Sequence, residues 1–238
     1  MAYFICLFSL RAHVSCRLNS PSMFAENALN LNKQKGVATL RLNSELVTLM
    51  SNLINRAMFY MVQNPEILKK VQAELDANPN TKMKDRSCTP YTEATLHEIQ
   101  RKANILPMSV FHYTSEPIRC GKEYIIPANT FLVPLIGKIM RDPEHFGPDP
   151  EKFDPERYLS TVNGKLTFTP HPRVIPFGIG KRRCLGEVMA RTSLFKFFTA
   201  IVQKFDVVSG QKEPLLDEAD DGFTKAPLPY KLIFNLRK

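Results

Sequence analysis

The sequence predicts a mainly α-helical protein with small β-sheets. Several long segments carry apolar residues at helical spacing, whereas the β-type runs are short and separated by proline and glycine. A chain of 238 residues is long enough to bury a sizeable core. Residues 17–36 are largely polar and show little periodicity, so we expect residues 1–42 to form a loop-like or disordered leader. We expect residues 43–238 to contain the folded domain.

Three helices are expected in the first half of this domain. The first spans residues 46–62, and its broad apolar face comprises Leu46, Leu49, Leu53, Ala57, Tyr60 and Met61. Pro65 ends that pattern and opens a second helix over residues 65–77, because proline is tolerated in a first turn. A third helix follows Thr92 and runs to about Lys102, before Pro107.

Short strands, a long coil and one further helix are expected after Pro107. The predicted strands cover residues 109–113, 123–126 and 130–135. Proline and acidic residues dominate residues 142–157, which predicts an ordered coil. Residues 185–205 give the strongest helical pattern, with Val188, Leu194, Phe198, Ile201 and Phe205 at helical spacing. Residues 207–208 and 231–235 predict a terminal hairpin.

Composition limits the possible classes of function. The net charge is +9, which favours an acidic protein partner or an anionic membrane surface. No basic run is interleaved with stacking aromatics, so we expect no nucleic-acid partner. The five cysteines are odd in number and have no Cys-x-x-Cys spacing, which argues against zinc and a disulfide framework. The apolar run over residues 3–10 is too short to span a bilayer, so no complete membrane anchor is expected.

One cysteine stands in a loop suited to holding a metal. The segment reads Pro176-Phe177-Gly178-Ile179-Gly180-Lys181-Arg182-Arg183-Cys184-Leu185-Gly186, and a helical pattern follows it. Free amides and the dipole at a helix start favour an anionic sulfur over a neutral thiol. Gly178, Gly180 and Gly186 allow a flat cofactor to approach the backbone, and Arg182 can donate to a carboxylate.

This loop resembles the heme-binding loop of the cytochrome P450 family, the heme-thiolate monooxygenases. Glu98-Ile99-Gln100-Arg101 is similar to the family's E-x-x-R motif, and Phe153-Asp154-Pro155-Glu156-Arg157-Tyr158 is similar to its P-E-R-F segment. The three motifs occur in the family's order, and the match runs from about Asn52 to the C-terminus. Residues 43–238 therefore resemble the C-terminal, heme-loop half of an animal microsomal member and form a partial cytochrome P450 domain.

The resemblance implies roles for individual residues. Cys184 would be the axial ligand of heme b iron. Further heme-binding residues would be His112, Phe177, Gly178, Gly180, Arg182 and Gly186. Glu98, Arg101 and Arg157 would form a buried structural triad, whereas spacing alone indicates only a surface pair of Glu98 with Arg101. The substrate cavity would be bordered by Ile105, Met108, Val110, Phe223 and Thr224.

The family's oxygen-activating A-G-x-[DE]-T motif is altered here. Ungapped alignment on Asn64-Pro65-Glu66 puts Leu46 where the family has a small residue and Leu49 where it has an alcohol. Thr48 lies one position early, about 100° around a helix from the expected side chain, and is a weak candidate for proton delivery.

The family implies oxidation of an apolar small molecule by molecular oxygen. A flavoprotein reductase would bind the basic face around residues 181–183, at the cytosolic side of the endoplasmic reticulum membrane. The altered motif leaves an alternative: a truncated or degenerate member that binds heme weakly or not at all and is not catalytic. A third hypothesis is an interaction module that uses the same basic face.

Overall fold

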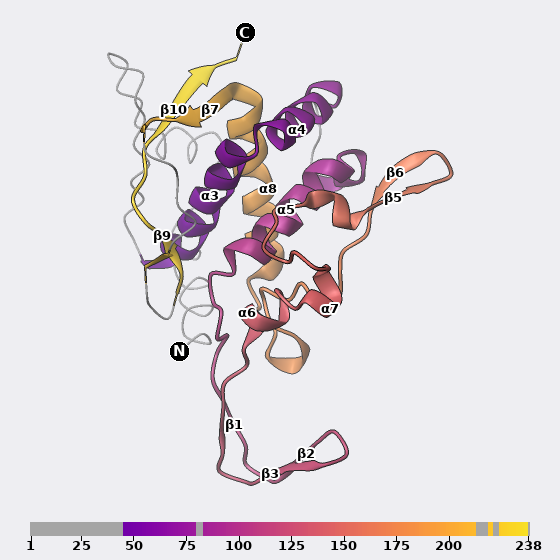
Figure 1. Cartoon of the computed structure of the whole chain (residues 1–238), viewed down its shortest axis with the longest axis vertical. Coiled ribbons are helices and arrows are strands. Elements are labelled where there is room, and N and C mark those ends of the chain that lie inside the picture. Colours follow the sequence, from indigo (N-terminus) through magenta and orange to yellow (C-terminus); the bar gives the residue numbers. More distant parts are fainter. Residues whose placement is uncertain (1–44, 80–82, 213–218, 221–223, 238) are drawn as a thin grey trace.

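A computed structural model of the protein describes residues 45–79, 83–212, 219–220 and 224–237. Figure 1 shows a helical body with two-stranded sheets at its edges. The helices are α3 (Glu45–Gln63), α4 (Pro65–Ala77), α5 (Pro90–Ala103), α6 (Ile136–Ile139), α7 (Pro143–Phe146) and α8 (Glu187–Lys204), with 3-10 turns η1 (Met83–Cys88), η2 (Pro155–Tyr158) and η3 (Gly180–Arg182). The expected leader, residues 1–42, lies outside the described residues.

Every described sheet is an antiparallel pair. The strands are β1 (His112–Tyr113), β2 (Ile118–Cys120), β3 (Tyr124–Ile126), β4 (Phe131–Leu132), β5 (Leu159–Val162), β6 (Lys165–Phe168), β7 (Phe205–Ser209), β8 (Ala219–Asp220), β9 (Ala226–Pro227) and β10 (Leu232–Leu236). The pairs are β1–β4, β2–β3, β5–β6, β7–β10 and β8–β9. The predicted terminal pairing is confirmed, with Phe234 opposite Val207. The mainly helical fold class with small sheets is therefore correct.

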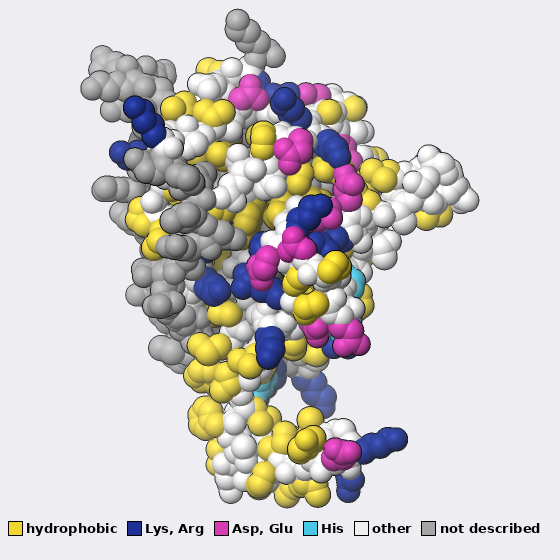
Figure 2. Space-filling view, in the orientation of Figure 1, with side chains coloured by type: hydrophobic (Ala, Val, Ile, Leu, Met, Phe, Trp, Pro, Cys, Tyr) yellow, Lys and Arg dark blue, Asp and Glu magenta, His cyan; other side chains and the backbone are white. Residues whose placement is uncertain are grey.

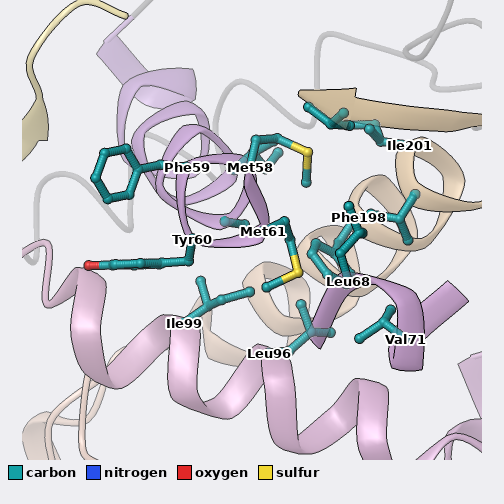
Figure 3. Close-up of a cluster of buried hydrophobic side chains, with 14 of the residues drawn as sticks. Met58, Phe59, Tyr60, Met61, Leu68, Val71, Leu96, Ile99, Phe198 and Ile201 are labelled. Carbon is teal, nitrogen blue, oxygen red and sulfur yellow. The ribbon is translucent and has the colours of Figure 1, made fainter. Parts of the chain in front are cut away.

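The main hydrophobic core lies among α3, α4, α5 and α8, and α8 contacts the other three. Figure 3 shows Met58 and Met61 of α3 pointing into this core, with Leu96, Ile99 and Phe198 around them. Most of the predicted apolar face of α3 is buried, and Ala57 and Met61 are fully so. Val188 instead remains 79% exposed, so the apolar spacing of α8 does not mark its first turn as core.

Helix α5 begins at Pro90 rather than after Thr92, and a side chain from another helix caps it. Glu74 of α4 accepts hydrogen bonds from the backbone amides of Tyr91 at 2.8 Å and Thr92 at 2.7 Å. It also accepts the Thr92 hydroxyl at 2.7 Å. The carboxylate therefore satisfies amides that no residue of α5 can bond and lies at the positive end of the helix dipole. This contact fixes α5 against α4.

Three other sequence predictions are wrong in detail. The coil over residues 142–157 contains α7 and η2, each opened by proline and capped by an aspartate, Asp142 or Asp154. The strand expected over residues 109–113 shrinks to β1. Ser109 adopts a positive φ of 53°, which no strand allows. The expected helix 185–205 begins at Glu187 and ends at Lys204, because Phe205 enters β7.

Hairpin β5–β6 was not expected. Asn163 and Gly164 connect its strands with φ values of 51° and 74°. This geometry is typical of the two-residue turns that Asn-Gly favours. The Asn-Gly pair between β-type residues was therefore the available signal.

Candidate functional site

The loop that carries Cys184 folds back on itself before α8. The Cys184 amide donates to the Phe177 carbonyl at 2.9 Å, and the Gly178 amide donates to the Ile175 carbonyl at 3.0 Å. The Cys184 carbonyl accepts the Glu187 amide at 3.4 Å, at the first turn of α8. Cys184 forms no disulfide with another described cysteine, and its side chain is half-buried. The thiol therefore lies close to the N-terminus of α8, where the partial positive charge of the helix favours a thiolate.

Glycines keep this loop free of side chains where a large group could approach. Gly178 and Gly180 have φ values of 72° and 71°, and a Cβ at either would meet no atom within 4 Å. A Cβ at Gly186 would lie 3.8 Å from the Cys184 Sγ. The first two positions favour glycine for their backbone conformation, and the third leaves space beside the sulfur. Leu185 also remains 68% exposed.

An ionic cluster holds the loop against α8. Glu187 is buried, and its carboxylate accepts from Arg183 and, at 2.8 Å, from Arg191. Burial raises the pKa of Glu187, but hydrogen bonds from Arg183 and Arg191 outweigh it and hold this pKa below its ordinary value. Arg191 also lies over the Phe177 ring, 5.2 Å from its centroid. Sequence reasoning assigned no role to Glu187. The i, i+4 spacing of Arg183, Glu187 and Arg191 was the available signal.

These residues fit a heme group. The open glycine-lined surface beside the half-buried thiol offers room for a flat cofactor. The cysteine sulfur, as a thiolate, is a ligand that can bind the iron of such a cofactor. Arg182 is exposed in η3 and carries the charge that a carboxylate of the cofactor would need.

A buried network on α5 centres on Glu98. The Glu98 and Arg101 side chains are fully buried and pair at 2.7 Å through two hydrogen bonds. Glu98 also accepts from the Tyr158 hydroxyl at 2.6 Å and from the Asp154 amide at 3.0 Å. Burial and the negative charge of Glu98 raise the pKa of Tyr158 well above its ordinary value. The phenol is therefore a permanent donor to this carboxylate.

Arg157 lies at the edge of the network. Its Nε is 3.8 Å from the nearest Glu98 oxygen, and its Nη atoms donate to the carbonyls of Phe146, Asp149 and Lys152. Arg101 donates to the same Lys152 carbonyl at 3.3 Å and to the Met140 carbonyl at 2.9 Å. The structure thus brings the three predicted residues together, but only Glu98 and Arg101 are fully buried, because the Arg157 side chain is 19% exposed. Tyr158 is an additional member that the sequence reasoning did not assign. Together they fix residues 146–158 on α5.

The predicted substrate residues come from two segments that lie side by side. Ile105, Met108 and Val110 are half-buried in the turn after α5. The Lys225 amide donates to the Ile105 carbonyl at 2.8 Å, which places half-buried Thr224 next to this turn. Phe223 lies outside the described residues.

The two remaining predicted residues lie elsewhere. His112 is half-buried on β1, opposite Leu132. Thr48 lies in the first turns of α3, but its side chain is not described.

His97 of α5 is buried close to Phe177 and Arg191 of the Cys184 site. His97 is 3% exposed and borders a cavity of about 300 Å³ that Phe177 and Arg191 also line. Its Nε2 accepts the His171 amide at 3.2 Å. Burial, and then the charge of Arg191, lower the pKa of His97 to about 3. Sequence reasoning did not identify this residue, because nothing in the helix pattern distinguishes it from an exposed histidine.

Comparisons with known proteins agree with the three motifs. The sequence model described as Cytochrome P450 matches residues 47–234. Cytochrome P450 2C44 of Mus musculus is 38% identical over 188 residues, which is 76% of this chain and 37% of the relative. Cytochrome P450 2A6 of Homo sapiens is 34% identical over 191 residues, or 78% of this chain and 38% of the relative. The chain thus spans less than two fifths of the length of these relatives. Because the family match covers most of its length, the chain belongs to the cytochrome P450 family.

Proposed function

We propose that this chain is the C-terminal, heme-loop part of a heme-dependent monooxygenase and that Cys184 binds the heme b iron. The observation that carries the proposal is the half-buried Cys184 thiol beside an open glycine surface at the start of α8. Family membership supplies the cofactor by analogy. A bound heme supplies oxygen activation, by which one oxygen atom enters an apolar substrate and the other is reduced to water with electrons from a flavoprotein reductase.

Each residue has a definite task in this proposal. Cys184 binds as the thiolate that α8 favours. Arg182 and His112 hold the carboxylates of the cofactor, and Phe177 limits water near the sulfur. The turn at Ile105, Met108 and Val110, with Phe223 and Thr224, borders the substrate. The Glu98 network takes part in no chemical step of the reaction. It holds the coil that leads to the loop.

The partners and location follow from the family and from charge. Lys181, Arg182 and Arg183 are exposed on η3 and the following residue, which suits an acidic face of a reductase. Location at the cytosolic face of the endoplasmic reticulum is part of the proposal, and contact with the membrane surface would follow from it. No helix among the described residues is long and apolar enough to cross a membrane.

A second candidate is that this chain is a truncated or degenerate family member, which binds heme weakly or not at all and has no monooxygenase activity. The observation that favours it is the sequence Glu45-Leu46-Val47-Thr48-Leu49 at the start of α3, which lacks the small residue and the alcohol of the family motif. Oxygen activation needs a closed site and a positioned proton donor. Thr48 is the weak candidate for that donor.

Ligand substitution tests the role of Cys184. The chain is loaded with heme, reduced and exposed to carbon monoxide, and its visible spectrum is recorded. We expect Cys184→Ser to abolish the red-shifted band that a thiolate ligand gives. Cys88→Ser and Cys120→Ser are matched controls, because both of these cysteines are free and exposed. A thiolate band that survives in Cys184→Ser, or disappears equally in a control, would overturn the assignment.

Turnover separates the two candidates. The heme-loaded chain is mixed with a reductase and a panel of apolar substrates, and product and peroxide are both measured. Product formation at about one turnover per second or faster supports the monooxygenase. Electron flow that ends in peroxide without product supports the second candidate.

A further inference from the structure

Hairpin β5–β6 ends in an exposed turn of two residues. Figure 1 shows the hairpin extending away from the helices, and no other segment covers it on the face visible in Figure 2. Asn163 and Gly164 form the turn, and both are exposed. They are the one Asn-Gly pair in the sequence. Solvent water therefore has access to a side-chain carboxamide and to the backbone amide that follows it.

Neither of these two groups is engaged by other contacts. Among the described residues, the Asn163 side chain makes no hydrogen bond and the Gly164 amide donates to no acceptor. Gly164 carries no side chain, so nothing beside its nitrogen hinders the approach of another group. The nitrogen and the Asn163 side chain belong to adjacent positions of the chain. A reaction between them is intramolecular, and a neighbouring group of this kind has a high effective concentration.

Asn129 shows how contacts oppose the same reaction. It also has a positive φ, 61°, but its Oδ1 accepts from the Tyr113 hydroxyl at 2.8 Å, which fixes the carboxamide in one orientation. The next amide, from Thr130, donates to the Thr114 hydroxyl at 2.8 Å. Its nitrogen would have to give up that hydrogen bond before it could attack the side chain. The two asparagines thus share a positive φ and differ in their contacts, which favours reaction at Asn163.

We propose that Asn163 is a site of spontaneous deamidation, a modification that the chain undergoes without an enzyme. The Gly164 amide loses its proton, and its nitrogen attacks the Asn163 Cγ. A bond from Cγ to this nitrogen forms, the bond from Cγ to Nδ2 breaks, and the NH₂ group takes up a proton and leaves as ammonia. Solvent water then opens the ring at either carbonyl and gives aspartate or isoaspartate. No atom is oxidised or reduced, and the proposal depends on neither heme nor monooxygenase activity.

The two products would change the hairpin in different ways. Both add a carboxylate to the turn and so remove one positive unit from the net charge of +9. Isoaspartate also carries the chain through its side-chain carbon, which lengthens the connection between Val162 and Lys165. The length of such a turn sets the pairing of its strands. We therefore expect isoaspartate, and not aspartate, to loosen β5–β6.

Incubation of the folded full chain at mildly alkaline pH, followed by peptide mapping with mass spectrometry, provides the test. Conversion of a carboxamide into a carboxylate gives a characteristic gain in mass, and an isoaspartate-specific methyltransferase labels the second product. We expect Asn163 to react at least about tenfold faster than Asn129, because the hydrogen bonds at Asn129 raise its barrier. Asn163→Gln is the negative control, since its longer side chain cannot close the same ring with the Gly164 nitrogen. It should yield no modified residue in this turn.

Thr130→Gly separates the effect of structure from that of sequence, because it places a glycine after Asn129 as well. The variant keeps the backbone amide that donates to Thr114. In the folded variant, we expect Asn163 to remain about tenfold faster than Asn129. In urea, where these contacts are lost, the two Asn-Gly pairs should react at similar rates. Circular dichroism confirms that the variant is folded.

Two results would overturn the proposal: an unmodified Asn163 in the incubated folded chain, or equal rates at Asn163 and Asn129 in the folded Thr130→Gly variant. Hydrogen exchange tests the effect on the hairpin. The isoaspartate product should exchange the amides of β5–β6 faster than Asn163→Asp, which has the same charge without the longer backbone. Equal exchange in the two would exclude the loosening of the hairpin.

Discussion

Replacement of Glu98 by glutamine should be among the most destabilising single-atom changes in this protein. The substitution keeps the shape of the side chain and replaces one carboxylate oxygen by an NH₂ group. Glu98 accepts four hydrogen bonds, from two nitrogens of Arg101, the Tyr158 hydroxyl and the Asp154 amide. An amide has one acceptor oxygen. One of the two oxygen positions that now accept hydrogen bonds would therefore carry an NH₂ group, which can only donate.

The expected cost follows from these contacts. Each hydrogen bond to a charged group contributes about 1.5–3 kcal/mol, and two of the four lie on whichever oxygen is lost. The Arg101 side chain is 0% exposed and would keep its charge in the interior without a counter-charge. Removal of one partner from a buried pair costs about 3–5 kcal/mol. The two lost hydrogen bonds give about 3–6 kcal/mol and the stranded charge about 3–5 kcal/mol. We therefore expect a loss of about 3–5 kcal/mol, a large part of a typical stability of about 5–15 kcal/mol.

Urea unfolding followed by far-ultraviolet circular dichroism measures this loss, with the slope of the transition as a check on two-state behaviour. Glu156→Gln is the matched control. Glu156 pairs with Lys70 at 2.6 Å, but both side chains are more than half exposed, so its loss should have little effect. The nitrogen–oxygen distances of the Glu98–Arg101 and Glu156–Lys70 pairs are nearly the same, so the two pairs differ mainly in burial.

A double variant tests the physical cause. If the penalty comes from a stranded charge, Glu98→Gln with Arg101→Met should be less destabilised than Glu98→Gln alone. Equal effects of Glu98→Gln and Glu156→Gln, or simple additivity in the double variant, would refute the reasoning.

Three further predictions follow from the same structure. Tyr158→Phe should lower the free energy of unfolding by about 1.5–3 kcal/mol, because it removes one donor to a buried carboxylate. Urea titration checks this, and a loss below about 0.5 kcal/mol would contradict it. Burial lowers the pKa of His97 in the folded chain from 6.5 to about 3. Between these two pH values the unfolded chain therefore binds a proton at His97 that the folded chain does not bind. Stability should therefore fall as pH drops from about 6.5 towards 3, by at most about 1.4 kcal/mol per pH unit. His97→Gln should flatten the slope between pH 6.5 and 5, and an unchanged slope would exclude His97 as its source. Gly137→Ala should destabilise by about 1–3 kcal/mol, because its Cβ would lie 2.4 Å from the Asn104 Nδ2 and 3.1 Å from the Pro107 Cβ. A neutral result in thermal unfolding would show that Asn104 moves aside freely.

A local sequence signal determined helix α4 and its proline boundary. Pro65 after Asn64 predicted α4 over residues 65–77, and the structure has the same bounds. The reason is local: proline fixes its own φ and lacks an amide that a first turn does not use. The Asn163-Gly164 turn carries an equally local signal, because Asn-Gly favours the positive φ values that this turn has.

The position of Cys184 was also within reach of the sequence. Glycines, a basic run and the following helical pattern lie within a few residues of one another, and the structure keeps them in one loop beside α8. The exposure of Val188 was not predictable from the same stretch. Apolar spacing shows which residues share a helix face but not whether another element covers that face.

Helix α5 shows what only the tertiary structure decided. Its sequence contains Glu98, Gln100, Arg101 and Lys102 and is typical of a solvated helix, yet the structure buries all four. Their burial depends on partners about 40–60 positions away, among them the Met140 carbonyl and the Tyr158 hydroxyl. The sequence by itself thus determined helix α4, the terminal strand pairing, the cysteine loop and the family motifs. Which charges lie inside was decided by packing, because a charged group is stable in the interior only where distant segments bring donors and acceptors to it.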